Sequence, residues 1–319
     1  MQSQVTANQY PHKLNKISCR LRNLFSFAPV FGMVARPEKQ DGISVIMRVK
    51  DEKDWIETSI TSIKTIADEI IVVDNGSTDG TFQIIDNIRS EEENLIKLSQ
   101  RPDLDFVSLS NHVLEQAEYR WVINWDGDMV AHTSGESDVR KLRERILSLD
   151  SRRFYVIYLR LINLAGDLLH QDPAEMVHIE EYVHTFSAKA RFMHTGHYEA
   201  VKFPRYYQPL FWYEPYAFHV NVKPARKMLL RYFWNAWLSL EDHHNHDGFE
   251  TFVGQHISQM FETGSWKKAQ QLCVERVCRN FIPYDTCTMG SYPDLLLPHV
   301  ENSRYRLRFD NGRIVGRDE

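Results

Sequence analysis

Acidic and polar side chains form three clusters, each directly after a short apolar run: residues 48–52, 74–79 and 126–128. In the last cluster Asp126 and Asp128 are separated by a single glycine, so both carboxylates can turn toward one hard cation. Such cations prefer oxygen ligands and usually keep water and substrate phosphates as their remaining partners. A nucleoside diphosphate would complete the site, and the cation would neutralise the charge that develops on the diphosphate as it leaves.

Buried strands are expected to position these clusters. The three apolar runs are short enough for parallel strands, and segments with helical periodicity lie between them. The runs cover Ile43–Met47, Ile70–Val73 and Trp121–Trp125. Strands that alternate with helices predict a largely parallel sheet, in which the ligand crevice lies beyond the carboxyl ends of the strands. We therefore expect all three clusters to face one ligand.

Local signals place helix starts and further strands. Asp51 is typical of the N-cap of a first helix, and Ser110 is expected to begin a third. A long aromatic helix is predicted at about residues 223–240, and the tail after Gly264 is expected to be helical and then irregular. Three further segments are expected to add mixed strands to the sheet: Tyr155–Leu164, Tyr182–Ala190 and Trp212–Asn221.

Composition excludes several classes of protein. A formal net charge of -5 argues against a protein whose main task is to bind nucleic acid, because that task needs an excess of Lys and Arg. The four cysteines lack the paired spacing of a zinc site or a disulfide framework, which indicates reduced thiols in a cytosolic protein. No stretch approaches the ~20 apolar residues that span a bilayer, and no secretory signal is recognisable, so we expect a cytoplasmic location.

Three runs of sequence resemble family 2 glycosyltransferases of the GT-A fold: residues 45–52, 68–81 and 125–128. The resemblance covers about residues 42–130. It implies an α/β, Rossmann-like fold with a mixed, mostly parallel sheet flanked by helices. It also implies inverting transfer of a sugar from a nucleoside diphosphate donor, for which a uridine base is expected. The cofactor would be Mn²⁺ or Mg²⁺, and the acceptor a glycan or a lipid-linked sugar.

The resemblance assigns roles to individual residues. Asp74 would contact the base of the donor nucleotide, whereas Asp126 and Asp128 would contact its ribose, its diphosphate and the cation. A late histidine often adds a metal ligand in this fold, and His219 is the best-placed candidate. Met47-Arg48 departs from the pattern, since many members have a proline there. The full expected sets are nucleotide-binding Val49, Lys50, Glu52, Asp74, Asn75 and Asp126, and metal-binding Asp126, Asp128 and His219.

An inverting reaction needs a general base that takes the proton of the acceptor hydroxyl, and a carboxylate within hydrogen-bond reach can do so. A subset of the family carries Gly, two residues, then His-Glu. The run Gly196-His197-Tyr198-Glu199 is similar, although it is one residue short. Glu199 is therefore the first choice for this catalytic role beside Asp128, and Glu214 and Asp172 follow.

These interpretations predict three parts of the chain. Residues 1–41 would form a basic amphipathic segment, residues 42–222 a GT-A catalytic domain, and residues 223–319 a helical C-terminal extension. Within the catalytic domain, residues 42–130 would bind the nucleotide sugar and residues 131–222 the acceptor.

Plainer interpretations stand beside these. The turn after the second strand could simply cap a helix, His219 could be a core histidine and Glu199 an ordinary carboxylate. The His-rich run at 241–247 is best interpreted as a polar loop, and the aromatic helix as core packing or as a site of peripheral membrane contact. Two rival functions are a sugar-nucleotide nucleotidyltransferase, whose Gly-rich loop is missing from residues 48–51, and a non-catalytic protein that binds nucleotide or glycan.

Overall fold

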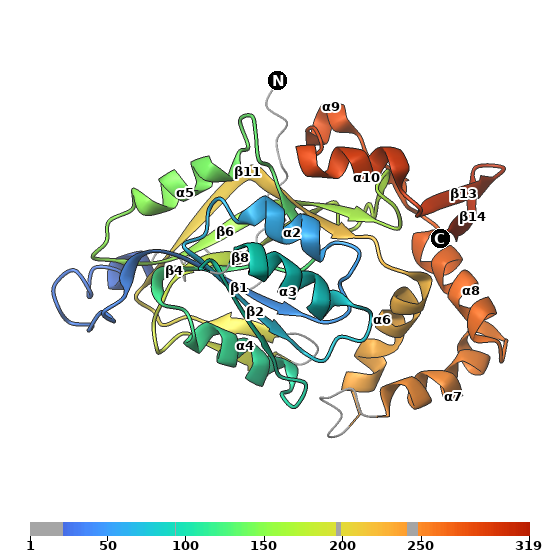
Figure 1. Cartoon of the computed structure of the whole chain (residues 1–319), viewed down its shortest axis with the longest axis horizontal. Coiled ribbons are helices and arrows are strands. Elements are labelled where there is room, and N and C mark those ends of the chain that lie inside the picture. Colours follow the sequence, from blue (N-terminus) through green and yellow to red (C-terminus); the bar gives the residue numbers. More distant parts are fainter. Residues whose placement is uncertain (1–21, 93, 196–198, 241–247) are drawn as a thin grey trace.

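An eight-stranded mixed sheet forms the centre of the described chain (Figure 1). The computed structural model describes residues 22–92, 94–195, 199–240 and 248–319. The strands lie in the order β3-β2-β1-β4-β8-β6-β11-β5. Their bounds are β1 Gln40–Val49, β2 Glu69–Asp74, β3 Ile96–Gln100, β4 Tyr119–Asn124, β5 Met129–Ala131, β6 Phe154–Ala165, β8 Val177–Thr185 and β11 Tyr207–Asn221.

The sheet has a parallel half and a mixed half. β1 pairs in parallel with both β2 and β4, and β2 pairs in parallel with β3. β8 runs antiparallel between β4 and β6, whereas β11 is parallel to β6 and pairs antiparallel with the edge strand β5. The predicted mixed, mostly parallel sheet is therefore confirmed.

Helices cover both faces of the sheet. Apolar side chains of α2, α3 and α5 share one cluster with the strands, and those of α4 belong to the cluster on the other face. In α2, Ile56, Ile60 and Ile63 recur at helical spacing and are completely buried, so one apolar stripe fixes the helix on the sheet. The bounds are α2 Ile56–Ile63, α3 Thr81–Glu91, α4 Phe106–Glu115 and α5 Val139–Leu147.

Three helices after the sheet form a separate layer. Leu229, Phe233 and Trp237 on α6 are buried in a cluster with α7 and α8, so the aromatic stripe of α6 is a packing face. The bounds are α6 Ala225–Leu238, α7 Phe249–Phe261 and α8 Trp266–Cys278.

The last part of the chain returns to the sheet. The irregular tail expected from the sequence is wrong, because the tail ends in a β13–β14 hairpin and shares an apolar cluster with β6 and β11. The division into three domains stays a prediction. The remaining elements are β7 His170–Gln171, β9 Arg191–His194, β10 Glu199–Lys202, β12 Ile282–Pro283, α9 Thr286–Met289, the 3₁₀ helix η1 Asp294–Leu296, α10 Leu297–Asn302, β13 Arg306–Asp310 and β14 Arg313–Asp318.

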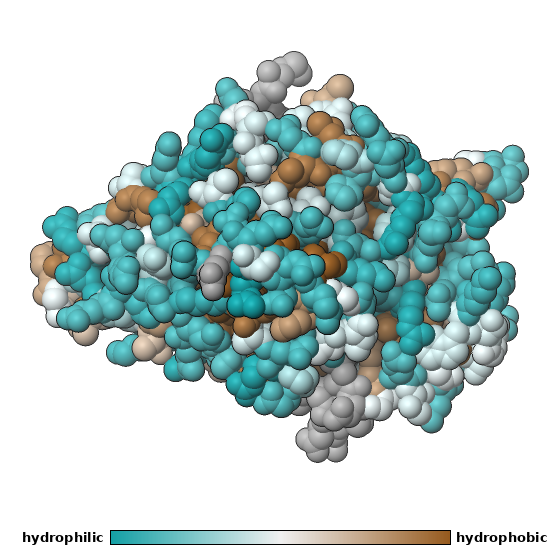
Figure 2. Space-filling view, viewed as in Figure 1, coloured by the Kyte–Doolittle hydropathy of each residue, from teal (hydrophilic) through white to brown (hydrophobic). Residues whose placement is uncertain are grey.

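One face of the molecule is mainly polar. On the face seen in Figure 2, hydrophilic residues cover most of the molecule and hydrophobic residues show only as small separate patches. Within the described ranges, no helix has both the length and the apolar character needed to cross a membrane.

Two predicted helix starts are wrong. Asp51 does not cap α2, because that helix begins only at Ile56. The backbone of Asp51 takes the left-handed conformation, and the Asp51 carboxylate accepts a hydrogen bond from the Thr78 backbone amide (2.7 Å). A partner in a distant loop has replaced the local cap. Helix α4 begins at Phe106 because Asp105 caps it by accepting hydrogen bonds from two backbone amides, so Ser110 lies inside the helix.

Strand β8 carries a buried histidine that makes stability depend on pH. His184 is completely buried, neither ring nitrogen has a hydrogen-bond partner among the described residues, and the ring lies edge-on to Phe203. Burial lowers the pKa of His184 to about 3, below its ordinary value of 6.5. As the pH falls from 6.5 toward 3, the unfolded chain therefore takes up a proton that the folded chain refuses, and stability is lost.

Replacing His184 with leucine should remove this contribution. Between pH 7.5 and pH 5, the free energy of unfolding of the wild type should fall by about 2 kcal/mol more than that of His184→Leu. Urea unfolding at the two pH values measures both differences. An equal loss in the two proteins would show that His184 does not titrate on unfolding in this range.

Candidate active site

The three polar clusters meet at the carboxyl ends of β1, β2 and β4. Val49 lies opposite Asp74 in the β1–β2 register, and its carbonyl accepts a hydrogen bond from the Asn75 amide (2.9 Å). Gly127 packs so tightly here that an added Cβ would lie 3.0 Å from the side chain of Glu52 and 3.3 Å from that of Val49. The expected convergence of the three clusters is therefore present in the fold.

Asp126, Asp128 and His219 come together from two distant segments. One ligand atom of each lies within 4.8 Å of the others. The register of β11 against β5 places His219 opposite Met129, and the carbonyl of Asp128 accepts a hydrogen bond from the Val220 amide (2.8 Å). Antiparallel pairing at the sheet edge thus brings the histidine beside the aspartate pair.

The hydrogen bonds of His219 fit a cation ligand. Asn163 donates from its amide nitrogen to a backbone carbonyl, so its Oδ1 faces His219 Nδ1 at 2.8 Å and Nδ1 carries the proton. Nε2 is then the ring nitrogen that faces Asp128 Oδ2, at 3.3 Å. In the neutral ring, the Nε2 lone pair would be free to bind a cation that the carboxylate also contacts. The donor set of two carboxylates and one imidazole suits a divalent cation.

Two lysines that no sequence motif marks supply positive charge beside these carboxylates. Lys223 Nζ lies 2.6 Å from Asp128 Oδ2 and 2.5 Å from Glu52 Oε2, and Lys227 Nζ lies 2.7 Å from Glu52 Oε1. Burial alone would raise the pKa of Asp128, but Lys223 and His219 outweigh it and hold that pKa well below its usual value. The only sequence signal was their position four residues apart at the start of the aromatic helix.

Asp126 differs from its neighbour. Its side chain is 45% exposed, and its nearest cation is Arg48, at 3.8 Å. Partial desolvation raises the pKa of Asp126, and the charge of Asp128 adds to the rise while Arg48 opposes it. The accessible carboxylate of the pair is thus the one with the weaker countercharge.

Asp74 is buried at the end of β2 with one oxygen left over. Oδ1 accepts hydrogen bonds from the amides of Gly76 and Ser77 and from the Gln100 side chain, each at 2.9 Å. Oδ2 is buried without a hydrogen-bond partner among the described residues. A buried carboxylate oxygen without a donor is costly, so a ligand N–H that reached this atom would remove that cost.

Other predicted nucleotide-binding residues lie close by but are engaged with protein. The side-chain amide of Asn75 donates to the backbone carbonyls of Arg101 (2.8 Å) and Leu104 (3.1 Å). These two bonds hold the loop that follows β3. Glu52 binds the two lysines, and the carbonyl of Lys50 accepts a hydrogen bond from Lys227 (3.1 Å). Their roles toward a nucleotide stay predictions.

The predicted general bases lie in three different places. Glu199 forms an ion pair with Arg48, which lies between it and Asp126, and accepts a hydrogen bond from Ser110. Glu214 is exposed and pairs with Arg145 (2.9 Å). Asp172 accepts a hydrogen bond from the Ala174 amide (2.9 Å). Residues 196–198 of the Glu199 motif and the His-rich run 241–247 lie outside the described residues.

Glu180 on β8 is a carboxylate that the sequence analysis did not consider. Its side chain is 58% exposed and lies 3.6 Å from His178, whose ring is 5.9 Å from the ring of His219. Its negative charge also helps to raise the pKa of Asp126. Glu180 therefore lies near Asp126 and His219, on the strand between β4 and β6.

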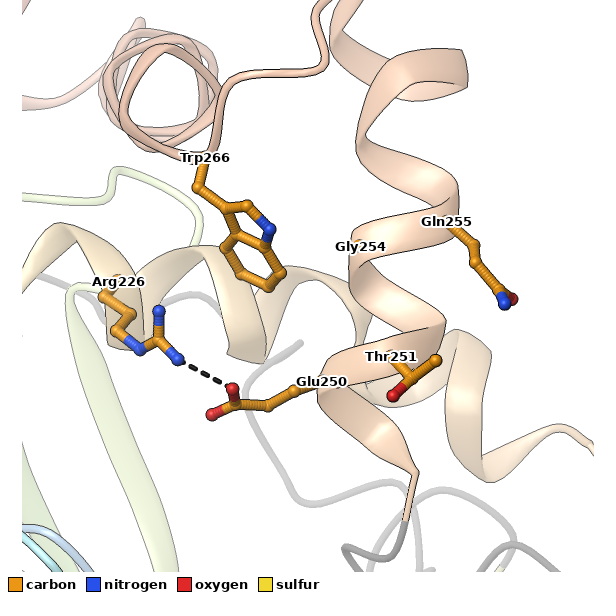
Figure 3. A pocket seen from close by; sticks show the side chains of 6 residues that line it. All are labelled: Arg226, Glu250, Thr251, Gly254, Gln255 and Trp266. Carbon is orange, nitrogen blue, oxygen red and sulfur yellow. Dashed lines mark hydrogen bonds and ion pairs between the residues drawn. The ribbon is translucent and has the colours of Figure 1, made fainter.

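A separate groove of about 500 Å³ lies among α6, α7 and α8 (Figure 3). Arg226 on α6 and Glu250 on α7 form an ion pair (2.7 Å) at its wall, beside the indole of Trp266. Its lining residues do not include Asp126, Asp128 or His219.

The mixed sheet, with an aspartate pair and a histidine at the carboxyl ends of its strands, has the arrangement of the GT-A fold. Residues 44–146 match the model of the family described as Glycosyl transferase family 2. The matched segment contains Asp74, Asp126 and Asp128.

The chain is also similar to individual proteins and solved structures. Uncharacterized glycosyltransferases of Rickettsia bellii (strain RML369-C) and Rickettsia typhi (strain ATCC VR-144 / Wilmington) are each 35% identical to the chain over 86 residues, which is 27% of this chain and 27% of theirs. The match thus spans about a quarter of the length of these relatives. A structure of S. aureus TarS 1–349 with UDP aligns at a TM-score of 0.40 with 19% identity, covering 68% of this chain and 72% of that one. The complex with UDP-GlcNAc gives 0.41 and 18%, covering 68% and 73%.

Proposed function

We propose that this protein is an inverting, metal-dependent glycosyltransferase that uses a nucleoside diphosphate sugar and transfers the sugar to a glycan or a lipid-linked acceptor. The observation that carries the proposal is that Asp74, which has one oxygen without a partner among the described residues, and the group Asp126, Asp128 and His219 lie at the carboxyl ends of strands on either side of β1. One end of the site suits a nucleotide base, and the other suits a diphosphate with its cation.

Asp74 would recognise the base. Oδ2, which has no partner in the part of the chain that the structure describes, can accept a hydrogen bond from an imide N–H, and N3–H of uracil is such a donor. The backbone amides on Oδ1 fix the carboxylate, so the accepting oxygen is oriented before the ligand arrives. A uridine diphosphate sugar is accordingly the proposed donor.

Asp126, Asp128 and His219 would hold Mn²⁺ or Mg²⁺. When bound, the cation supplies positive charge to the diphosphate leaving group. Asn163 keeps Nε2 of His219 turned toward Asp128, and the carboxylate of Asp126 is partly exposed, so a donor can reach it. These side chains orient the diphosphate and stabilise the charge it gains as the sugar departs.

The general base must take a proton from the acceptor hydroxyl on the side of the sugar opposite the diphosphate. We favour Glu180 over Glu199 for this role. A carboxylate that is already paired with a guanidinium is a weaker proton acceptor, and Glu199 is paired with Arg48. Glu180 also has a partner, since it lies 3.6 Å from His178, but that partner is a histidine and not a guanidinium, and Glu180 is more exposed and lies near Asp126.

Replacing Asp74 with asparagine should weaken binding of UDP by about 10- to 100-fold. The variant keeps an oxygen for the turn but turns an N–H₂ group toward the base, where a donor now meets a donor. Isothermal titration calorimetry with UDP and Mn²⁺ measures the change. Binding of pyrophosphate with Mn²⁺ should stay the same, since it has no base. Equal loss for both ligands would mean that Asp74 acts on the whole site and does not read the base.

A thermal-shift screen tests the proposed function as a whole. A ligand that binds only the folded state raises the melting temperature, so UDP or a UDP-sugar with Mn²⁺ should raise it and the same ligands with EDTA should do so less. No shift with any nucleoside diphosphate or nucleotide sugar, with or without Mn²⁺, would overturn the proposal. Release of pyrophosphate from a nucleoside triphosphate and a sugar phosphate would favour the rival nucleotidyltransferase.

A further inference from the structure

Lys223 is buried between the carboxylates of Glu52 and Asp128. It lies between the end of β11 and the start of α6, and its side chain is only 6% exposed. The ammonium contacts Asp128 Oδ2 and Glu52 Oε2, which uses two of its three donors. Asp128 Oδ2 is also the oxygen that faces His219 Nε2. One carboxylate oxygen thus has two possible positive partners, the ammonium and a cation held with His219.

The end of the chain described here fixes Lys223. The Arg317 guanidinium donates to the carbonyl of Lys223 and to that of Gly166, both at 2.6 Å, and its side chain is 1% exposed. The Ala225 amide donates to the Glu319 carboxylate at 2.7 Å. These contacts hold the turn that carries Lys223, so β14 orders the turn and does not merely cover it.

The charges around Asp128 are already balanced before any ligand binds. Lys223 neutralises part of the negative charge of Glu52 and Asp128, and Lys227 binds Glu52 and two backbone carbonyls. A divalent cation that approaches Asp128 is therefore repelled by an ammonium at hydrogen-bond distance from the same oxygen. A diphosphate changes this, because its oxygens give the ammonium a new anionic partner.

We propose that Lys223 couples the binding of the cation to the binding of the diphosphate. In the free site its ammonium holds Asp128; when a nucleoside diphosphate binds, the ammonium contacts a phosphate oxygen and Asp128 is released to the cation. This proposal rests on the proposed function. Because coupling between two ligands is reciprocal, the nucleotide should raise the affinity for the cation by the same factor that the cation raises the affinity for the nucleotide.

The direction in which the affinity for Mn²⁺ alone changes separates this coupling role of Lys223 from a purely structural role. We expect Lys223→Met to bind Mn²⁺ alone on the order of ten-fold more tightly than the wild type, because the competing charge is gone. The same variant should bind UDP in EDTA on the order of ten-fold more weakly, and UDP should no longer raise its Mn²⁺ affinity. Electron paramagnetic resonance of free Mn²⁺ and calorimetry with UDP, both on the full chain, give these values.

Arg226→Met is the matched control. It removes one positive charge from the first turn of α6, shortly after Lys223 in the chain, but Arg226 pairs with Glu250 in the groove of Figure 3, away from Asp128 and Glu52. Its Mn²⁺ and UDP affinities should stay within about two-fold of the wild type. Lys223→Arg keeps the charge and should keep weak binding of Mn²⁺ alone.

The outcomes are distinct. If Lys223→Met does not fold, the wild type still tests the proposal. A wild type that binds Mn²⁺ with the same affinity in the presence and absence of UDP would overturn the coupling. A folded Lys223→Met or Lys223→Gln that binds Mn²⁺ no tighter than the wild type also overturns it. If UDP binds to none of these proteins under any condition, the proposed function fails instead.

Discussion

Replacing Asp128 with alanine should lower the rate of sugar transfer by roughly 100- to 1,000-fold, because the charge that holds the cation under the diphosphate is lost. The carboxylate is buried and is the point where Lys223 and His219 meet. Transfer from a UDP-sugar at saturating Mn²⁺ measures the effect.

The fold should survive this change. Lys223 keeps its contact with Glu52, so no buried charge loses every partner. Circular dichroism and the melting temperature test this directly. Asp86→Ala is the matched control, since Asp86 pairs with Arg89 on the surface of α3 and touches no site residue. Full activity in Asp128→Ala would refute the assignment of Asp128.

Replacing Glu180 with glutamine should lower transfer by about 100-fold or more and leave donor binding nearly unchanged. Glutamine has the same shape but cannot accept the proton of the acceptor hydroxyl. A change in kcat without a change in the affinity for UDP is the signature of a group that acts only in the chemical step. Single-turnover transfer and calorimetry with UDP separate the two quantities.

Glu199→Gln is the informative comparison. It leaves Arg48 without its closest carboxylate, so we expect altered donor binding through Asp126, which lies on the other side of Arg48. If Glu199→Gln loses transfer with normal donor binding and Glu180→Gln does not, the base is Glu199, as the sequence predicts. If both retain transfer, Glu214 or Asp172 takes the role.

Local sequence predicted the residues at the ends of the strands well. β1, β2 and β4 are short apolar runs, and parallel pairing brings their carboxyl ends to one edge of the sheet. The placement of Asp74, Asp126 and Asp128 at that edge therefore follows from the pattern alone. Capping was less predictable. Asp51 has the right type and spacing for a helix N-cap, yet its carboxylate binds the Thr78 amide in another loop.

The sequence by itself therefore determined the α/β class and the acidic turns, because hydrophobic period and residue type are local properties. Only the tertiary structure decided what surrounds those turns. The β5–β11 pairing brings His219 to Asp128, the turn held by Arg317 brings Lys223 to the same oxygen, and β8 brings Glu180 beside them. Each of these neighbours is far along the chain, so it is fixed by packing and long-range pairing, which leave no periodic trace in the residues themselves.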